Sequence, residues 1–226
     1  MKFNFGAKEM CKVIDLHTHT IFSDGELLPS ELARRAEQKG YKVIGITDHV
    51  DFSNVESVIF SITRVCEHIN SSMKIRAVAG VEITHVSPVE IVPLVAKARQ
   101  LGAKIVLVHG ETIVEPVAEG TNREAIEAGV DILAHPGIIQ EADAQLAAER
   151  KIYIEISGRK GHSFSNGHLT KMWYKYGFPL ILNSDTHSPD DLIDDDFAKR
   201  LIISAGVCEN DVKKVLDNSF RLFEKL

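Results

Sequence analysis

The chain has 226 residues, of which 44% are hydrophobic and 26% charged, a composition that predicts one globular domain with a full core and excludes disorder. Its 26 basic and 32 acidic residues give a net charge of −6, which argues against binding of long nucleic acid, because a phosphate backbone is bound by a basic surface. Three scattered cysteines predict neither a disulfide framework nor a thiolate metal site. The sequence shows no signal segment or membrane span, so we expect a cytoplasmic protein without a membrane partner.

Seven apolar runs are predicted as strands, and each is followed by a segment with a helical pattern. They do not alternate between apolar and polar residues, which is typical of parallel strands covered on both faces. The runs lie at residues 12–16, 43–47, 75–83, 104–108, 131–134, 152–156 and 179–183.

The segments between these runs carry the signals that begin and end helices. Pro29 and Gly40 bound one helix, and the capping-box patterns at 87–90 and 121–124 begin two more. Repeated βα units without a linker predict a single α/β domain over 1–226, a seven-stranded TIM-like β/α barrel, with an open doubly wound sheet as the runner-up. A final amphipathic helix at 210–226 is expected to pack across the barrel.

Histidine and carboxylate side chains follow the predicted strands at their carboxyl ends, which is the rim where β/α barrels build active sites. His17 and His19 point to the same side of one strand, so both can bind one ion. The set is too large for one ion and predicts two or three, with Zn²⁺, Mn²⁺ or Fe²⁺ favoured over Mg²⁺ and Ca²⁺. The candidate ligands are His17, His19, Asp24, His49, Glu82, His109, His135, Asp185 and His187.

The loop after the sixth predicted strand offers positive charge instead of metal ligands. Arg159 presents a guanidinium fork suited to phosphate, and Lys160, His162 and His168 lie in the same loop. We expect these four residues to bind substrate. The alternatives are that Arg159 pairs with a loop carboxylate, that Lys160 is solvated, and that the two histidines only stabilise the loop.

Several acidic residues near the ligands receive simpler interpretations. Asp15 and Asp48 are expected to orient ligand imidazoles, as metal-binding histidines usually require, with surface or turn roles as the alternative. Glu111 and Glu115, in the loop after His109, are expected to be solvated, with an alternative role in screening substrate charge.

The segments DLHTHTIFSDG, GITDH, GVE, LVHGE, ILAHPG and NSDTH resemble, in order, the motif series of the PHP (polymerase and histidinol phosphatase) superfamily. The resemblance implies a distorted seven-stranded barrel, phosphoesterase activity and a trinuclear metal centre in which Glu82 bridges ions. By this resemblance, the first ion would be held by His17, His19, Glu82 and Asp185. The second would be held by Asp24, His49 and His187. The third would be held by Glu82, His109 and His135.

The predicted activity is hydrolysis of a small phosphomonoester by a metal-bound hydroxide, with histidinol phosphate as the candidate named by the resemblance. Asp185 or His187 is the candidate to protonate the leaving oxygen, and Arg159 completes the predicted catalytic set. The main alternative is a nucleotide or oligonucleotide phosphodiesterase or nuclease of the same superfamily. An amidohydrolase usually recruits a lysine at a strand end, whereas Lys104 begins its strand, and a non-catalytic RNA-binding subunit would be basic.

Overall fold

A computed structural model describes residues 13–226, so Cys11 and the first residue of the first predicted strand lie outside the described residues. The described strands form one parallel sheet in the order β1-β2-β4-β5-β6-β7-β8, with a short strand β3 that pairs with β4. The strands are β1 (Ile14–Asp15), β2 (Val43–Ile46), β3 (His49–Val50), β4 (Arg76–Ile83), β5 (Ile105–His109), β6 (Ile132–Ala134), β7 (Tyr153–Ser157) and β8 (Leu180–Asn183). The seven predicted strands are confirmed, and β3 was not expected.

The first and last strands approach each other just beyond their carboxyl ends. The backbone N–H of His19 donates to the carbonyl of Thr186 over 2.8 Å, and that of Asp185 donates to the carbonyl of His17 over 3.1 Å. These bonds nearly close the sheet and confirm the predicted barrel over the open-sheet alternative. They also bring residues from opposite ends of the chain to the same rim.

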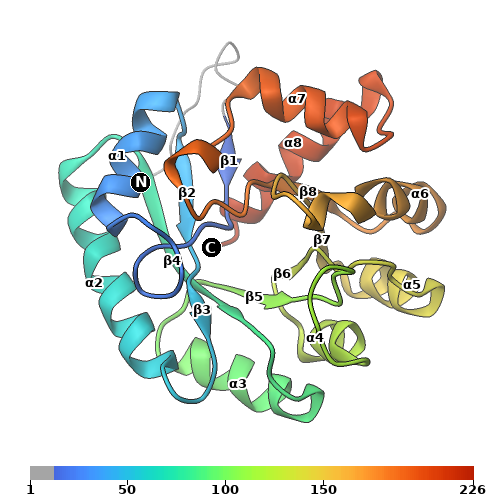
Figure 1. Cartoon of the computed structure of the whole chain (residues 1–226), viewed down its shortest axis with the longest axis horizontal. Helices are drawn as coiled ribbons and strands as arrows, with labels where there is room; N and C mark the ends of the chain where they lie inside the picture. The colour runs from blue at the N-terminus through green and yellow to red at the C-terminus, as the bar shows by residue number, and fades with distance from the viewer. Residues whose placement is uncertain (1–12) are drawn as a thin grey trace.

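The described strands are accompanied by eight α-helices, most of which lie around the outside of the barrel (Figure 1). They are α1 (Pro29–Lys39), α2 (Val55–Ser72), α3 (Pro88–Gln100), α4 (Thr121–Ala128), α5 (Glu141–Arg150), α6 (Asn166–Tyr176), α7 (Asp195–Ser204) and α8 (Glu209–Phe223), with short 3₁₀ turns η1 (His162–Ser165) and η2 (Pro189–Asp191). No helix in the described part of the chain is both long and apolar enough to cross a membrane.

Two of the three predicted helix starts are confirmed. Helix α1 begins at Pro29, and Ser87 makes the predicted capping box before α3. The capping box predicted at Thr121 is wrong, because Thr121 is already the first residue of α4 and its hydroxyl donates to the carbonyl of Ala118. The Glu111 carboxylate takes the capping role instead, by accepting from the backbone N–H groups of Gly120 and Asn122.

Helix α8 packs under the amino-terminal end of the barrel, opposite the rim that carries the predicted ligands. Val212 and Val215 are buried, and Leu222 joins the cluster that fills the barrel interior. The Asn218 amide donates to the carbonyl of Leu180 at the start of β8. The expected packing of the last helix is confirmed, and it leaves the carboxyl-terminal rim free for a site.

Candidate metal centre

Glu82, near the end of β4, lies at the centre of the predicted ligands and is fully buried. Its Oε1 is 3.3 Å from Nε2 of His17 and 3.5 Å from Nε2 of His135. Its Oε2 is 3.6 Å from Nε2 of His19 and 2.8 Å from Nδ1 of His49. One carboxylate therefore contacts four imidazoles that follow three different strands, β1, β2 and β6, as a bridging ligand requires.

Asp185, which follows β8, contacts three of the same imidazoles as Glu82. Its Oδ1 lies 3.3 Å from Nε2 of His19 and 3.7 Å from Nε2 of His17, and its Oδ2 lies 3.6 Å from Nε2 of His135. Burial and the neighbouring Glu82 raise the pKa of Asp185 to about 7. Asp185 has φ +55 and His135 has φ +31, left-handed conformations that non-glycine residues rarely adopt and that are concentrated at functional sites.

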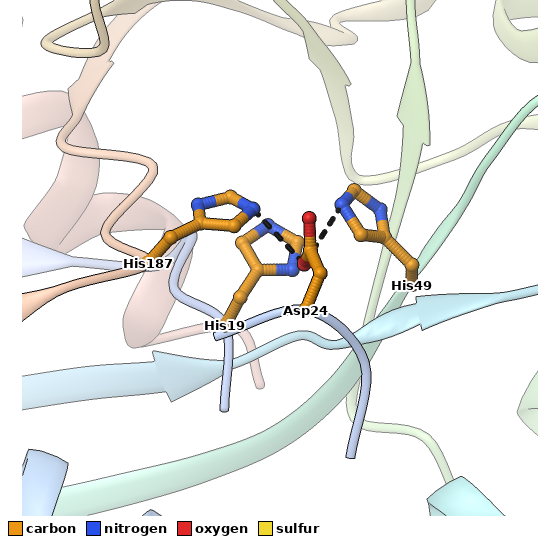
Figure 2. A group of neighbouring side chains, drawn as sticks. All are labelled: His19, Asp24, His49 and His187. Atoms are coloured by element: carbon orange, nitrogen blue, oxygen red, sulfur yellow. Dashed lines mark ion pairs between the residues drawn. The ribbon is translucent and has the colours of Figure 1, made fainter. Parts of the chain in front are cut away.

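Asp24 joins His19, His49 and His187 in a second group (Figure 2). Its Oδ1 is 3.1 Å from Nε2 of His187 and 3.4 Å from Nε2 of His49. The turn that places Asp24 needs a glycine at position 25, because a Cβ there would lie 2.5 Å from the carbonyl oxygen of His19. Asp24 thus lies with the other predicted ligands, and all nine form one cluster.

The ligand atoms of this cluster fit divalent ions. The buried atoms without a hydrogen-bond partner include Nε2 of His17 and of His19, both carboxylate oxygens of Glu82 and Oδ1 of Asp185. Burying such polar and charged atoms without a hydrogen bond is costly, and a bound cation would offset this cost. Bonds of 2.0–2.1 Å to a tetrahedral ion place ligand atoms about 3.3 Å apart, close to the separations observed between these imidazoles and carboxylates.

Glu155, in the middle of β7, is a buried residue at the candidate site that the sequence analysis missed. The Nδ1 of His17 donates to Glu155 Oε2 over 2.8 Å, and the Asn183 side-chain amide donates to the same oxygen over 2.7 Å. A carboxylate in this position fixes the imidazole so that Nε2 faces the centre. The available signal was an acidic residue inside an otherwise apolar strand.

The expectation that Asp15 and Asp48 orient imidazoles is wrong. Asp15 accepts hydrogen bonds from the backbone N–H groups of His17 and Ser184. Asp48 accepts from the backbone and hydroxyl of Thr20. Both carboxylates therefore fix the backbone of the loops that carry the ligands.

A pocket of about 230 Å³ opens above the cluster, and Arg159 and His162 are the predicted substrate-binding residues that line it. The Arg159 side chain is 31% exposed, and its Nε lies 3.9 Å from Oδ2 of Asp185. Lys160 is exposed and His168 Nε2 donates to the carbonyl of Ile139, and neither residue lines this pocket.

Glu115 lines the pocket as well, so the expectation that it is simply solvated is wrong. Its carboxylate lies within 3.4 Å of Nε2 of three histidines, His85, His109 and His162. These neighbours hold the pKa of Glu115 well below its usual range. No spacing in the sequence links this loop residue to the ligands.

The chain matches a known protein family and a related protein over most of its length. The model of the PHP domain matches residues 15–175. The chain is 46% identical over 204 residues to the uncharacterized protein MJ1295 of Methanocaldococcus jannaschii, a match that covers 89% of this chain and 94% of the relative.

Solved structures that are similar in fold include the following two. A chain of an archaeal ribonuclease P, determined with mature tRNA, aligns with a TM-score of 0.72 and 18% identity over 94% of this chain and 90% of that one. A candidate histidinol phosphatase from Listeria monocytogenes aligns with a TM-score of 0.60 and 12% identity over 80% of this chain and 97% of that one. At these identities the likeness concerns the fold alone.

Proposed function

This chain belongs to the PHP domain family, and from the geometry of its site we propose that it is a metal-dependent phosphoesterase acting on a small phosphomonoester. The observation that carries the proposal is the convergence of buried, unpartnered ligand atoms beneath a pocket that also contains a guanidinium group. The pocket volume of about 230 Å³ is below the range typical of drug-sized ligands. A small substrate is therefore favoured, and histidinol phosphate is the first candidate.

We assign the nine clustered side chains to two or three divalent ions. One set consists of His17, His19, Glu82 and Asp185. The second consists of Asp24, His49 and His187. The third includes Glu82, His109 and His135. Bound ions would supply a water of lowered pKa and would neutralise the negative charge that develops on the phosphoryl oxygens.

Phosphate binding, protonation of the leaving oxygen and orientation of a ligand are assigned to individual side chains. Arg159 binds the non-bridging phosphate oxygens, because its guanidinium offers parallel N–H donors and lines the pocket beside Asp185. We assign protonation of the leaving oxygen to Asp185 or His187, which also line the pocket. Glu155 holds the His17 ring in the orientation that ion binding requires.

A hydrolysis assay with Zn²⁺- or Mn²⁺-loaded protein tests this function. The substrates are histidinol phosphate, other small phosphomonoesters, nucleoside bisphosphates, short oligonucleotides and an activated phosphodiester. We expect hydrolysis of small monoesters that is abolished by a chelator and by His17→Ala. Activity confined to oligonucleotides would replace the proposal with a nuclease, and inactivity on every phosphoester would refute it.

Arg159 allows a sharper version of the test. The Arg159→Ala variant is expected to lower kcat/KM for phosphoesters by about ten-fold or more, because charge-assisted hydrogen bonds contribute about 1.5–3 kcal/mol. Lys160→Ala is the matched control, since the neighbouring cation lies outside the pocket lining. Equal kinetics in the two variants would remove Arg159 from the proposed phosphate site.

A further inference from the structure

We propose that Glu115 and His162 are additional ligands of the ion held by His109 and His135. The proposal rests on the proposed function, because it concerns one end of the same metal centre. It adds to that centre two residues from loops that the motif series does not include. Both residues line the pocket above the cluster.

Glu115 is carried by the loop that follows β5, six residues after His109. Its Oε2 lies 3.0 Å from Nε2 of His109, and its Oε1 lies 3.4 Å from Nε2 of His162. The Nδ1 of His109 faces the carbonyl of Gly110 at 3.1 Å, which leaves Nε2 directed toward the carboxylate. These two separations are close to the value of about 3.3 Å expected between ligand atoms on a tetrahedral ion.

His162 is the first residue of η1, in the loop that follows β7, and its side chain is buried. Its ring stacks on that of His135 with centroids 4.0 Å apart and planes at 10°. Its Nδ1 is hydrogen-bonded to the hydroxyl of Thr112 at 2.8 Å, so the ring orientation is fixed. One nitrogen from each of His109, His135 and His162 lies within 4.8 Å of the others, so the three imidazoles are close enough together to be candidates for one ion.

The packing of the two loops shows why these residues meet. Gly161 has φ +87, and a Cβ at this position would lie 3.2 Å from the Val114 side chain. The Val114 side chain therefore packs directly against Gly161, and the next residue of each loop is a candidate ligand. An exposed ion pair between Glu115 and one histidine would contribute little, whereas a carboxylate shared among several imidazoles is the arrangement that a cation requires.

The proposed ligands predict a distinct metal-binding defect. Zn²⁺ is titrated into the full-length wild-type chain and the Glu115→Gln and His162→Gln variants in competition with a colorimetric chelator. Each variant is expected to bind one Zn²⁺ equivalent about ten-fold or more weakly, because loss of even an indirect partner of a metal ligand costs 10- to 100-fold. The other equivalents are expected to keep their wild-type affinity.

Matched controls are Glu119→Gln, an exposed carboxylate in the same loop, and His68→Gln, an exposed histidine on α2. Both controls are expected to bind every Zn²⁺ equivalent as the wild type does. Glu115 is partly exposed on a loop, so Glu115→Gln decides the question even if His162→Gln fails to fold.

The outcomes separate this inference from the proposed function. Unchanged Zn²⁺ affinity in both variants, in a wild-type protein that binds Zn²⁺ and hydrolyses phosphomonoesters, would overturn the ligand proposal alone. A wild-type chain that binds no Zn²⁺ would overturn both. Selective loss of one equivalent in a protein that hydrolyses no phosphoester would support the ligands and refute the activity.

Discussion

The Glu155→Gln substitution tests how the protein prepares its metal ligands. Glu155 is fully buried in β7, accepts from Nδ1 of His17 over 2.8 Å and accepts from the Asn183 amide over 2.7 Å. Glutamine has nearly the same shape but no charge, so it keeps the packing and removes the carboxylate that fixes the His17 tautomer. The imidazole then becomes a weaker and less well oriented ligand.

The expected magnitude is a 10- to 100-fold loss of affinity for the ion bound by His17, or about 1.4–2.7 kcal/mol. Chelator competition on the purified variant measures this loss directly. Asp143→Asn is the control, because it neutralises another buried carboxylate, paired with Arg123 and located on α5. Wild-type affinity in Glu155→Gln, or an equal loss in Asp143→Asn, would refute the reasoning.

Three further predictions concern stability. In Gly45→Ala, the new Cβ would lie 2.8 Å from the Cα and carbonyl oxygen of Leu16. Urea unfolding should show that the free energy of unfolding falls by at least about 1–3 kcal/mol, because the backbone of Leu16 cannot move aside as a flexible side chain does. In Leu222→Ala, the cavity left under the barrel should cost about 2–5 kcal/mol without changing the number of bound ions, which metal analysis measures. The backbone N–H of Lys74, which donates to the Glu37 carboxylate over 2.7 Å, lowers the pKa of that carboxyl below its ordinary 4.5. This stabilisation is complete at pH 7 and is lost as the pH falls through the lowered pKa, so the free energies of unfolding of wild type and Glu37→Gln should differ at pH 7 and converge in acid.

The fold could be predicted because its signals are local and repeated. Each apolar run is long enough to mark a buried parallel strand, and Pro29 and Ser87 begin helices by their own chemistry. Strand β3 was missed because two residues carry no recognisable pattern. The start of α4 was misplaced because the carboxylate that caps it belongs to Glu111, nine residues before the N-cap residue Gly120. Such a contact depends on how the loop folds back onto the helix.

The metal ligands could be predicted because strand topology places them. Parallel strands bring their carboxyl ends to one rim. His17 and His19 therefore lie close to Asp185 regardless of how the connecting helices are arranged. Glu155 was missed because a single acid inside a strand has no spacing that distinguishes a functional role. Glu115 was interpreted as solvated because its position depends on the packing of two loops, which local sequence patterns do not encode.

The most direct test of the metal centre is an anomalous diffraction measurement on crystals of the Zn²⁺-loaded protein at the zinc absorption edge. The account predicts two or three anomalous peaks within the cluster, with one peak in contact with both Glu82 and His17. Fully loaded crystals in which every anomalous peak lies outside this cluster would contradict the account.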